Sequence, residues 1–246
     1  MPVLARGCRL VKMAGRAETY EALEPRQMLS GDYLRFDLAA QAGTNSVVTA
    51  DFDHNGVMDL AAANAEGGSI SVILSKEGKF QSTDNYPTGG TPFELGLFDF
   101  DHDTFPDLMA FDRQNSQLLM LHNEGDGTFS SGPGIQMPAG AHSVRVGDFN
   151  ADHRMDLAVL MPGENAVRIY LLDEGQNGPP TLGSFASYAV GNSASFLEMG
   201  DVNADGALDL VTANTGDDTV TVLTPVGLVP GSVEVPAKGV EITTGE

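Results

Sequence analysis

The sequence predicts an all-β protein, a β-propeller-like array of four blades that forms either a four-bladed or an incomplete propeller. An acidic nine-residue pattern begins at residues 51, 99, 148 and 201. Short apolar runs flank each copy, and no long segment has the 3.6-residue period of an amphipathic helix. Repeats of roughly 40–50 residues with about four short strands each are typical of propeller blades or stacked β arrays.

Residues 1–32 differ from the repeats, and we expect an N-terminal leader that is disordered or contains a short helix ending before Pro25. Its first half is rich in basic residues. No apolar core of about 7–15 residues follows them, so a conventional secretory signal peptide is not indicated.

The first repeat illustrates the elements that each blade should contain. Residues 46–50 form a strand that enters the acidic loop, and residues 60–64 form a strand that leaves it. Residues 69–74 alternate with period two, as a half-buried strand does. A fourth, outer strand or loop extends to about residue 90.

The same order of elements returns three times. Entering strands are expected at residues 93–98, 143–147 and 196–200, and third strands at residues 117–121, 166–172 and 219–223. The repeat domain is therefore assigned to residues 33–232, with residues 233–246 as a C-terminal tail. If the four blades close into a ring, residues 33–38 supply the outer strand of the last blade.

The acidic pattern has the chemistry of a Ca²⁺ loop. In the first copy, Asp51, Asp53, Asn55 and Asp59 fall at alternate positions, and Val57 between them can offer its backbone carbonyl. Calcium takes roughly six to eight oxygen ligands, and side chains at positions 1, 3 and 5 of a tight loop converge on one point. We expect about four structural Ca²⁺ sites and no other cofactor.

The candidate ligands occupy the same positions in each loop. The side-chain donors are Asp51, Asp53, Asn55 and Asp59 in loop one; Asp99, Asp101, Asp103 and Asp107 in loop two; Asp148, Asn150, Asp152 and Asp156 in loop three; and Asp201, Asn203, Asp205 and Asp209 in loop four. The carbonyl donors are Val57, Phe105, Arg154 and Ala207.

The sixth position of each loop must turn sharply. Gly56 and Gly206 do so at little cost, but Thr104 and His153 stand there in loops two and three. A β-branched Thr disfavours positive φ, so loop two either adopts another geometry or stores strain. We predict that loop two still binds Ca²⁺, because all four of its side-chain donors are carboxylates.

Composition excludes several classes of partner. The formal charge is −21 with only 13 Lys and Arg, whereas nucleic acids and anionic membranes require clustered basic residues. No run approaches the roughly 18–20 apolar residues of a membrane span. The single Cys8 excludes an intrachain disulfide.

Two of the loops carry a family resemblance. Residues 147–152 read Gly-Asp-Phe-Asn-Ala-Asp, and residues 200–206 read Gly-Asp-Val-Asn-Ala-Asp-Gly. They resemble the G-D-F-N-G-D-G core of the FG-GAP/VCBS repeat family, which includes the blades of integrin α-subunits. The resemblance spans about residues 40–230 and implies a β-propeller with Ca²⁺ in one hairpin loop per blade. Family propellers usually have seven blades, whereas four are visible here.

Residues 23–30 resemble the LEPRxLL segment found near the N-terminus of many large bacterial surface proteins. Met28 replaces the first Leu of the pair. The resemblance implies export, and therefore an extracellular or cell-surface location in a bacterium.

Enzyme signatures are weak. The chain has no Gly-rich phosphate loop, no His-Glu-x-x-His pair and no Gly-x-Ser-x-Gly elbow. His54, His102 and His153 lie in the acidic loops at positions that should face away from the cation, and His122 and His142 are isolated in sequence.

We expect a non-enzymatic interaction or adhesion module for an unidentified protein or glycan. The alternative is an accessory or catalytic domain of a secreted polysaccharide-acting enzyme. That alternative predicts a deep pocket with convergent His, Tyr or Arg side chains away from the acidic loops.

Overall fold

The computed structural model describes residues 37–173, 181–225 and 237–243. The chain divides into two units, Met1–Asp37 and Leu38–Glu246, and the repeats lie in the second. The leader at residues 1–32, with its LEPRxLL-like segment, lies outside the described residues.

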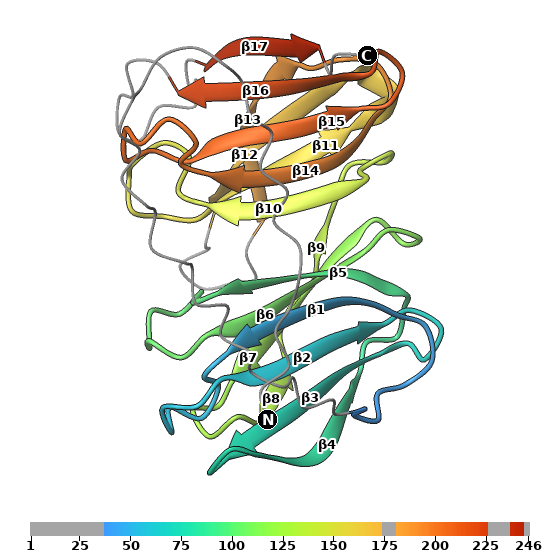
Figure 1. Cartoon of the computed structure of the whole chain (residues 1–246), viewed down its shortest axis with the longest axis vertical. Helices are drawn as coiled ribbons and strands as arrows, with labels where there is room; N and C mark the ends of the chain where they lie inside the picture. The colour runs from blue at the N-terminus through green and yellow to red at the C-terminus, as the bar shows by residue number, and fades with distance from the viewer. Residues whose placement is uncertain (1–36, 174–180, 226–236, 244–246) are drawn as a thin grey trace, which may run out of the picture. The chain divides into compact units, whose positions relative to one another are not determined.

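Four antiparallel sheets follow one another along the chain and are arranged as the blades of a β-propeller (Figure 1). Blade one contains β1 (Thr44–Ala50), β2 (Asp59–Asn64), β3 (Ser69–Lys76) and β4 (Lys79–Pro87). Blade two contains β5 (Pro92–Phe98), β6 (Asp107–Asp112), β7 (Gln117–Asn123), β8 (Phe129–Ser131) and β9 (Ile135–Gln136). Within each blade, each strand pairs with the next in sequence, except that β9 pairs with β7 instead of β8.

The second half of the domain repeats this order. Blade three contains β10 (Ser143–Gly147), β11 (Asp156–Met161), β12 (Ala166–Asp173) and β13 (Thr181–Ala189). Blade four contains β14 (Ala194–Gly200), β15 (Asp209–Asn214), β16 (Thr219–Pro225) and β17 (Ala237–Thr243). The 3₁₀ helix η1 (Pro162–Glu164) joins β11 to β12, and within the described residues no helix is long and apolar enough to span a membrane.

The outer strand of blade two is split because its sequence interrupts the ladder. Gly132, Pro133 and Gly134 separate β8 from β9, and a proline has no backbone N–H to donate to a neighbouring strand. The N–H of Gly132 still donates to the carbonyl of Met120, at 2.8 Å, so the two short strands remain on the edge of β7.

The core lies between consecutive blades. Strands β6 and β11 are buried along their whole length, which explains why their sequences are continuous apolar runs rather than alternating ones. One cluster joins Phe111 of blade two to Val159 of blade three, and two others join blades one and two and blades three and four. Each large apolar side chain buried in this way stabilises the fold by roughly 1.5–3 kcal/mol.

The outer edge of blade four differs from the expectation. Strand β17 pairs with β16 from Thr219 opposite Thr243 to Pro225 opposite Ala237. Strand β17 therefore takes the position expected for residues 33–38. It also lies within residues 233–246, for which a C-terminal tail was expected. Of residues 33–38, only Asp37 and Leu38 are described, and neither is in a strand. The alternation of Val240 and Ile242 with polar residues is a short strand signal that the tail assignment overlooked.

Candidate metal loops and a pocket between the blades

Each acidic loop connects the first strand of a blade to the second. The first strand ends immediately before the first Asp of the loop, and the second strand begins at its last Asp. In blade one, for example, Ala50 pairs with Asp59, and the loop closes this hairpin. The twenty candidate ligand residues therefore lie in these four loops or at the first position of the strand that follows each loop.

Loop one folds around its own carboxylates. Asp51 accepts hydrogen bonds from the N–H groups of Asn55, at 3.0 Å, and Gly56, at 2.8 Å. The side chain of Asn55 accepts from the N–H of Val57 at 2.8 Å, and Asp59 accepts from the N–H of Phe52 at 2.8 Å. These bonds turn side chains from positions 1, 5 and 9 towards the inside of one small loop.

The same bonds recur in the other three loops. The first Asp accepts from the N–H of position 5 at 3.1, 3.2 and 3.0 Å in loops two, three and four. It accepts from the N–H of position 6 at 3.0, 2.9 and 2.9 Å. The N–H of position 7 donates to position 5 at 2.8, 2.8 and 2.9 Å. The four loops thus share one geometry although their residues differ. Exposure to solvent alone would not require this common geometry.

Two left-handed residues make the loop possible. Position 6 has φ of 84° at Gly56, 80° at Thr104, 65° at His153 and 86° at Gly206. Position 4 is also left-handed in every loop. Loop two therefore keeps the common geometry, and Thr104 stores the strain that a β-branched residue has at positive φ, of order 1–3 kcal/mol.

The last Asp of each loop is buried, with 0 or 1% of its surface exposed. Burial raises the pKa of Asp59 and Asp107, and it raises the pKa of Asp156 to about 7. Neighbouring loop carboxylates raise these pKa values further. A bound divalent cation would offset both the cost of burying this carboxylate and its repulsion by neighbouring carboxylates.

Loop four contains a buried oxygen atom without a hydrogen-bond partner. In blades one and two, the N–H groups of Ser75 and Asn123 donate to Oδ1 of Asp59 and Asp107, at 2.6 and 2.8 Å. The residue at the matching place in β16 is Pro225, which has no N–H. Oδ1 of Asp209 is buried and has no donor, so this oxygen is available to a cation.

The donor oxygens are close enough to share one ion in the first two loops. Ligand atoms of Asp51, Asp53 and Asp59 lie within 4.8 Å of one another, as do those of Asp99, Asp101 and Asp103. In each loop the N–H of the carbonyl-donor residue donates to the side chain at position 5.

One residue near loop two was missed by sequence reasoning. Nδ1 of His122 lies 3.4 Å from Oδ2 of Asp101 and 3.3 Å from Oδ1 of Asp107. His122 appeared isolated because it is far from the loop in sequence. It lies on β7 directly opposite Asp107 once the register Leu108–Leu121 is known.

Two of the loop histidines, His54 and His153, have different surroundings. The ring of His54 stacks on the ring of Phe105 in the next blade, with centroids 4.3 Å apart, and His153 is almost fully exposed. Asn123 links the same two loops, because its Nδ2 donates to the carbonyls of Phe52, at 2.9 Å, and Pro106, at 3.1 Å. Loops one and two therefore support each other.

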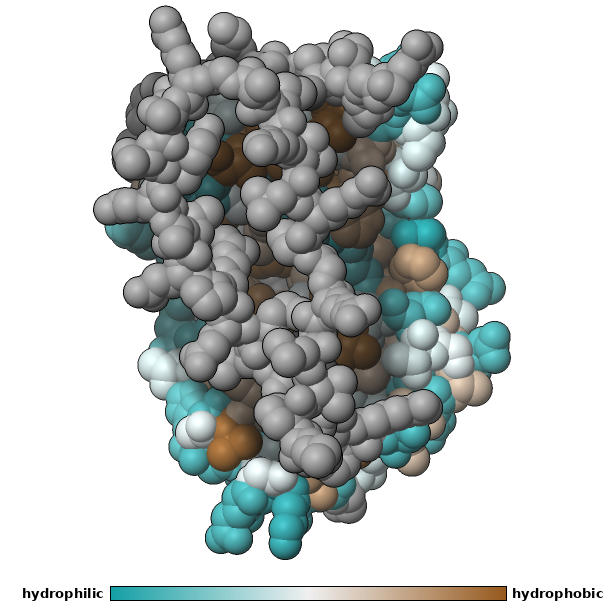
Figure 2. All heavy atoms as spheres, viewed as in Figure 1, coloured by the Kyte–Doolittle hydropathy of each residue, from teal (hydrophilic) through white to brown (hydrophobic). Residues whose placement is uncertain are grey.

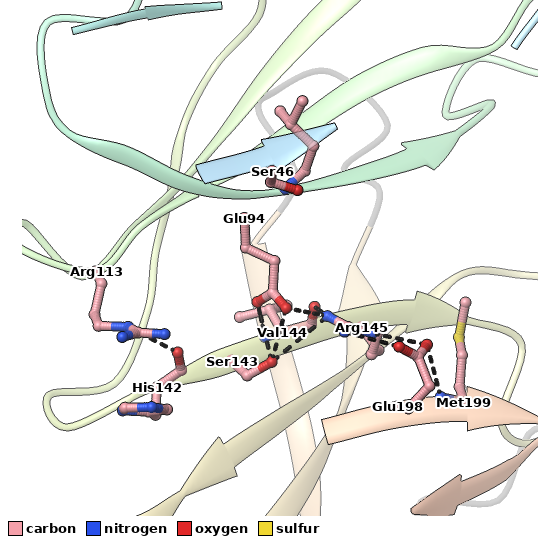
Figure 3. A network of polar contacts seen from close by, with 10 residues as sticks. Ser46, Glu94, Arg113, His142, Ser143, Val144, Arg145, Glu198 and Met199 are labelled. Atoms are coloured by element: carbon pink, nitrogen blue, oxygen red, sulfur yellow. Dashed lines mark hydrogen bonds and ion pairs between the residues drawn. The ribbon is translucent and has the colours of Figure 1, made fainter. Parts of the chain in front are cut away.

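A second feature is a pocket of about 400 Å³ bordered by the first strands of all four blades. Its wall includes Ser46 from β1, Glu94 from β5, Arg145 from β10 and Phe196 from β14. The innermost strands meet there, and Figure 3 shows the polar network that crosses from β5 to β10 and on to β14.

Arg145 is the centre of this network. It donates to Glu94 on one side and to Glu198 on the other, the latter at 3.2 Å. Burial lowers the pKa of Arg145, but its hydrogen bonds to Glu198 and Glu94 outweigh burial and raise it. Glu94 also accepts from the hydroxyl of Ser143 and the N–H of Val144, so one carboxylate joins blade two to blade three.

Arg113 and His142 lie at the other side of the pocket. Nε of Arg113 donates to the carbonyl of His142 at 3.0 Å, and its guanidinium lies 3.9 Å from the centroid of the Phe93 ring. Burial lowers the pKa of both Arg113 and His142, and Arg113 lowers that of His142 further. Sequence reasoning found none of the pocket residues, because they come from separate repeats and share no local pattern.

Comparison with known proteins identifies the repeats. The model of the FG-GAP-like repeat family matches residues 51–110 and 99–159, which include loops one, two and three. Loop four lies beyond the matched residues but has the same hydrogen bonds. No curated protein matches the sequence.

Solved structures show the same fold at low sequence identity. A protein from Lactobacillus plantarum is 14% identical with a TM-score of 0.56, and the match covers 85% of this chain and 58% of that one. The periplasmic gluconolactonase PpgL of Pseudomonas aeruginosa is 18% identical with a TM-score of 0.55, covering 82% of this chain and 55% of that one.

BBS1N, in a complex with ARL6DN, is 14% identical with a TM-score of 0.53, covering 82% of this chain and 57% of that one. The chain thus spans less than two thirds of each of these structures. Residues 51–159 consist of FG-GAP-like repeats, and they form part of a four-bladed, propeller-like arrangement of antiparallel sheets.

Proposed function

We propose that this protein is a calcium-binding repeat protein of the bacterial cell surface or exterior that acts as an interaction or adhesion module for a protein or carbohydrate ligand. The observation that carries the calcium part is the repetition of one inward-turned loop geometry in all four blades, each with a buried terminal Asp. The unpartnered Oδ1 of Asp209 supports it independently.

The proposed role of Ca²⁺ is structural. The side chains at positions 1, 3, 5 and 9 and the carbonyl at position 7 of each loop would hold the ion, and bound Ca²⁺ would cancel repulsion among the carboxylates. At free Ca²⁺ about a hundredfold above Kd, each site adds about 2.7 kcal/mol to the stability of the folded state. Several such sites are comparable with the whole stability of a typical domain, about 5–15 kcal/mol.

Calorimetric titration with one loop disabled at a time tests this assignment. The variants Asp51→Asn, Asp99→Asn, Asp148→Asn and Asp201→Asn each remove charge from the residue that accepts two backbone N–H groups in its loop. We expect about four ions per wild-type chain and about three per variant chain. Asp84→Asn, at an exposed residue of β4, is the control and should leave the count unchanged.

Loop two gives the sharpest result, because Thr104 strains it. If Asp99→Asn binds as many ions as the wild type, loop two is empty and the charge of its carboxylates does not outweigh the strain.

The surface location is supported by one sequence feature and by the calcium level outside cells. The LEPRxLL-like segment at residues 23–30 is typical of exported bacterial proteins, and extracellular calcium is high enough to fill even weak sites. Fractionation of the producing cells, with detection of the full chain, tests it. Recovery in the cytoplasmic fraction alone would contradict the proposal.

A second candidate function is favoured by the pocket. A domain of a polysaccharide-acting enzyme would be expected to bring His, Arg and carboxylate side chains together away from the acidic loops. His142, Arg113 and Glu94 line the pocket in this way. Release of reducing ends from a panel of polysaccharides, lost in His142→Ala, would establish this function, whereas binding without turnover would support the interaction module.

A further inference from the structure

The two arginines of the pocket between the blades differ in how they pair with carboxylates of the protein. Arg145 is held between two carboxylates, those of Glu94 and Glu198. Arg113 has a different environment, because its recorded hydrogen bond goes to a backbone carbonyl and uses only Nε. Within the described residues, the two terminal amino groups of Arg113 have no hydrogen-bond acceptor. Glu94 acts on Arg113 through space without a hydrogen bond, so the pocket presents one cationic fork whose terminal amino groups can still bind an anion.

The guanidinium of Arg113 is also fixed in place. The carbonyl of His142 holds Nε, and the central carbon of the guanidinium lies over the Phe93 ring, 3.9 Å from its centroid. Figure 3 shows the side chain reaching from the β6–β7 turn towards His142, next to the start of β10. A planar guanidinium fixed in this way is preorganised to bind a carboxylate through two parallel N–H···O bonds.

The rest of the wall combines exposed rings with hydroxyl groups. Phe196 is 52% exposed and Phe93 is 39% exposed, although each lines the pocket. The oxygen of Ser46 accepts the N–H of Leu95 at 3.1 Å, and its own O–H remains able to donate. The aromatic rings can contact the C–H groups on the faces of a ligand ring. The hydroxyl and carboxylate groups beside them can form hydrogen bonds with hydroxyls on the edge of that ring.

The volume of the pocket and the charges on its wall limit the class of ligand that it can bind. About 400 Å³ lies in the range of small-molecule sites, which is roughly 300–1,000 Å³. Arg113, Arg145 and Glu94 line the pocket, and Arg145 also pairs with Glu198, which is not part of the pocket wall. The whole chain has a net charge of −21. Glu94 lies in the same pocket and repels a doubly charged phosphate more strongly than a single carboxylate, with which Arg113 can pair.

We propose that this pocket binds a uronic acid, a sugar ring with one carboxylate, whose carboxylate pairs with Arg113 and whose ring contacts Phe93 and Phe196. This inference deepens the interaction function proposed above, because it names the ligand class, and it rests on that function. The sugar can be a free monosaccharide acid or one residue of an acidic polysaccharide, since both present the same group.

Binding of defined sugars to the full, calcium-loaded chain tests the proposal. The probes are D-glucuronate, D-galacturonate, an oligogalacturonate, D-glucose as the neutral ring, and acetate as the carboxylate without a ring. We expect at least one acidic sugar to bind about tenfold more tightly than glucose and acetate. Preference for the oligomer over both monosaccharides would assign the site to a polysaccharide, and the reverse would assign it to a free sugar acid.

Variants connect the binding to the pocket. Arg113→Met removes the charge but keeps much of the side-chain volume, and we expect it to lower the affinity about tenfold or more. Arg168→Met is the matched control, since Arg168 also lies over a phenylalanine ring, that of Phe185, but is remote from this pocket. Phe196→Ser alters an exposed wall residue and should lower affinity even if Arg113→Met folds poorly.

Three results would overturn the proposal: no binding of any acidic sugar, equal binding of glucose and glucuronate, or unchanged affinity in both Arg113→Met and Phe196→Ser. The calcium dependence of the melting temperature is measured on the same samples. A wild-type chain that is stabilised by calcium but binds no acidic sugar would refute the uronic acid site and leave the calcium function standing. A chain that binds uronate but whose melting temperature does not change with calcium would refute the calcium function and leave the uronic acid site standing.

Discussion

At the scale of single residues, the sixth position of each acidic loop shows how far backbone strain is tolerated. Gly56 and Thr104 have almost the same φ, 84° and 80°, in loops with the same hydrogen bonds. A Cβ at Gly56 would meet no atom within 4 Å, so a substitution there changes backbone conformation energy and little else.

Exchanging these residues should therefore have opposite effects. We expect Gly56→Thr to destabilise the fold by about 1–2 kcal/mol, and Thr104→Gly to stabilise it by up to about 1 kcal/mol, because glycine relieves strain but loses more entropy on folding. Urea unfolding at saturating Ca²⁺ measures both. Gly163→Ala is the control, at another open glycine whose φ is not positive, and should change stability by less than about 0.5 kcal/mol. Destabilisation by both exchanges would show that the strain argument is wrong.

Asp112 provides a pH-dependent contribution away from the metal loops. Burial raises the pKa of Asp112, but hydrogen bonds from Asn115 and Thr91 outweigh burial and leave its pKa below the usual value. A carboxylate whose folded pKa is depressed stabilises the protein above its unfolded pKa, and this stabilisation is lost as pH falls through the folded pKa. We expect Asp112→Asn to destabilise the protein by about 1–3 kcal/mol at pH 7, and by less near pH 3.

Comparing wild type and variant at each pH removes the effect of calcium release, which both share. Urea unfolding between pH 7 and pH 3 gives the difference directly. A difference that grows as the pH falls would contradict the assigned sign.

At the scale of elements, strand β16 shows how one backbone group can affect an acidic loop. Pro225 occupies the place where β3 and β7 donate an N–H to the buried Asp of their own loops. We predict that Pro225→Ala supplies this N–H to Asp209 and stabilises the calcium-free protein by about 1 kcal/mol. The gain should shrink in saturating calcium, because the ion already satisfies the same oxygen.

Thermal unfolding of the variant in chelator and in Ca²⁺ checks this prediction. Pro162→Ala, in η1, is the control and should give no calcium-dependent difference. An equal effect of Pro225→Ala in both conditions would mean that Oδ1 of Asp209 does not face the ion.

The acidic loops, unlike the pairing of the strands, could be predicted from the sequence. The acidic loops were predictable because their ligands lie within nine consecutive residues, so the local pattern of Asp51 to Asp59 contains the whole site. His122 was not predictable, because its place beside Asp107 depends on the register of β6 against β7. Strand β17 was missed because its alternation is short and follows a segment rich in Gly and Pro.

At the scale of the whole molecule, the blades are joined by two kinds of contact. Apolar clusters fill the space between consecutive blades, and the pairs around Glu94 and Arg145 connect their first strands. In the view of Figure 2, hydrophilic side chains are prominent along the edges of the repeat domain, as expected where the acidic loops and turns are exposed. The number and type of blades followed from the repeat length, whereas the pocket depends on residues about 50 positions apart that only the assembled blades bring together.

Thermal unfolding of the full chain in Ca²⁺ and in excess chelator tests the central claim most directly. Each occupied loop should add about 2.7 kcal/mol at saturating calcium, and for a chain of this size one such site corresponds to a rise in melting temperature of roughly 5–10 °C. We expect a rise of at least this size, lost on chelation and restored by added Ca²⁺. An identical melting temperature in calcium and in chelator would contradict the claim that these four loops are metal sites that hold the blades together.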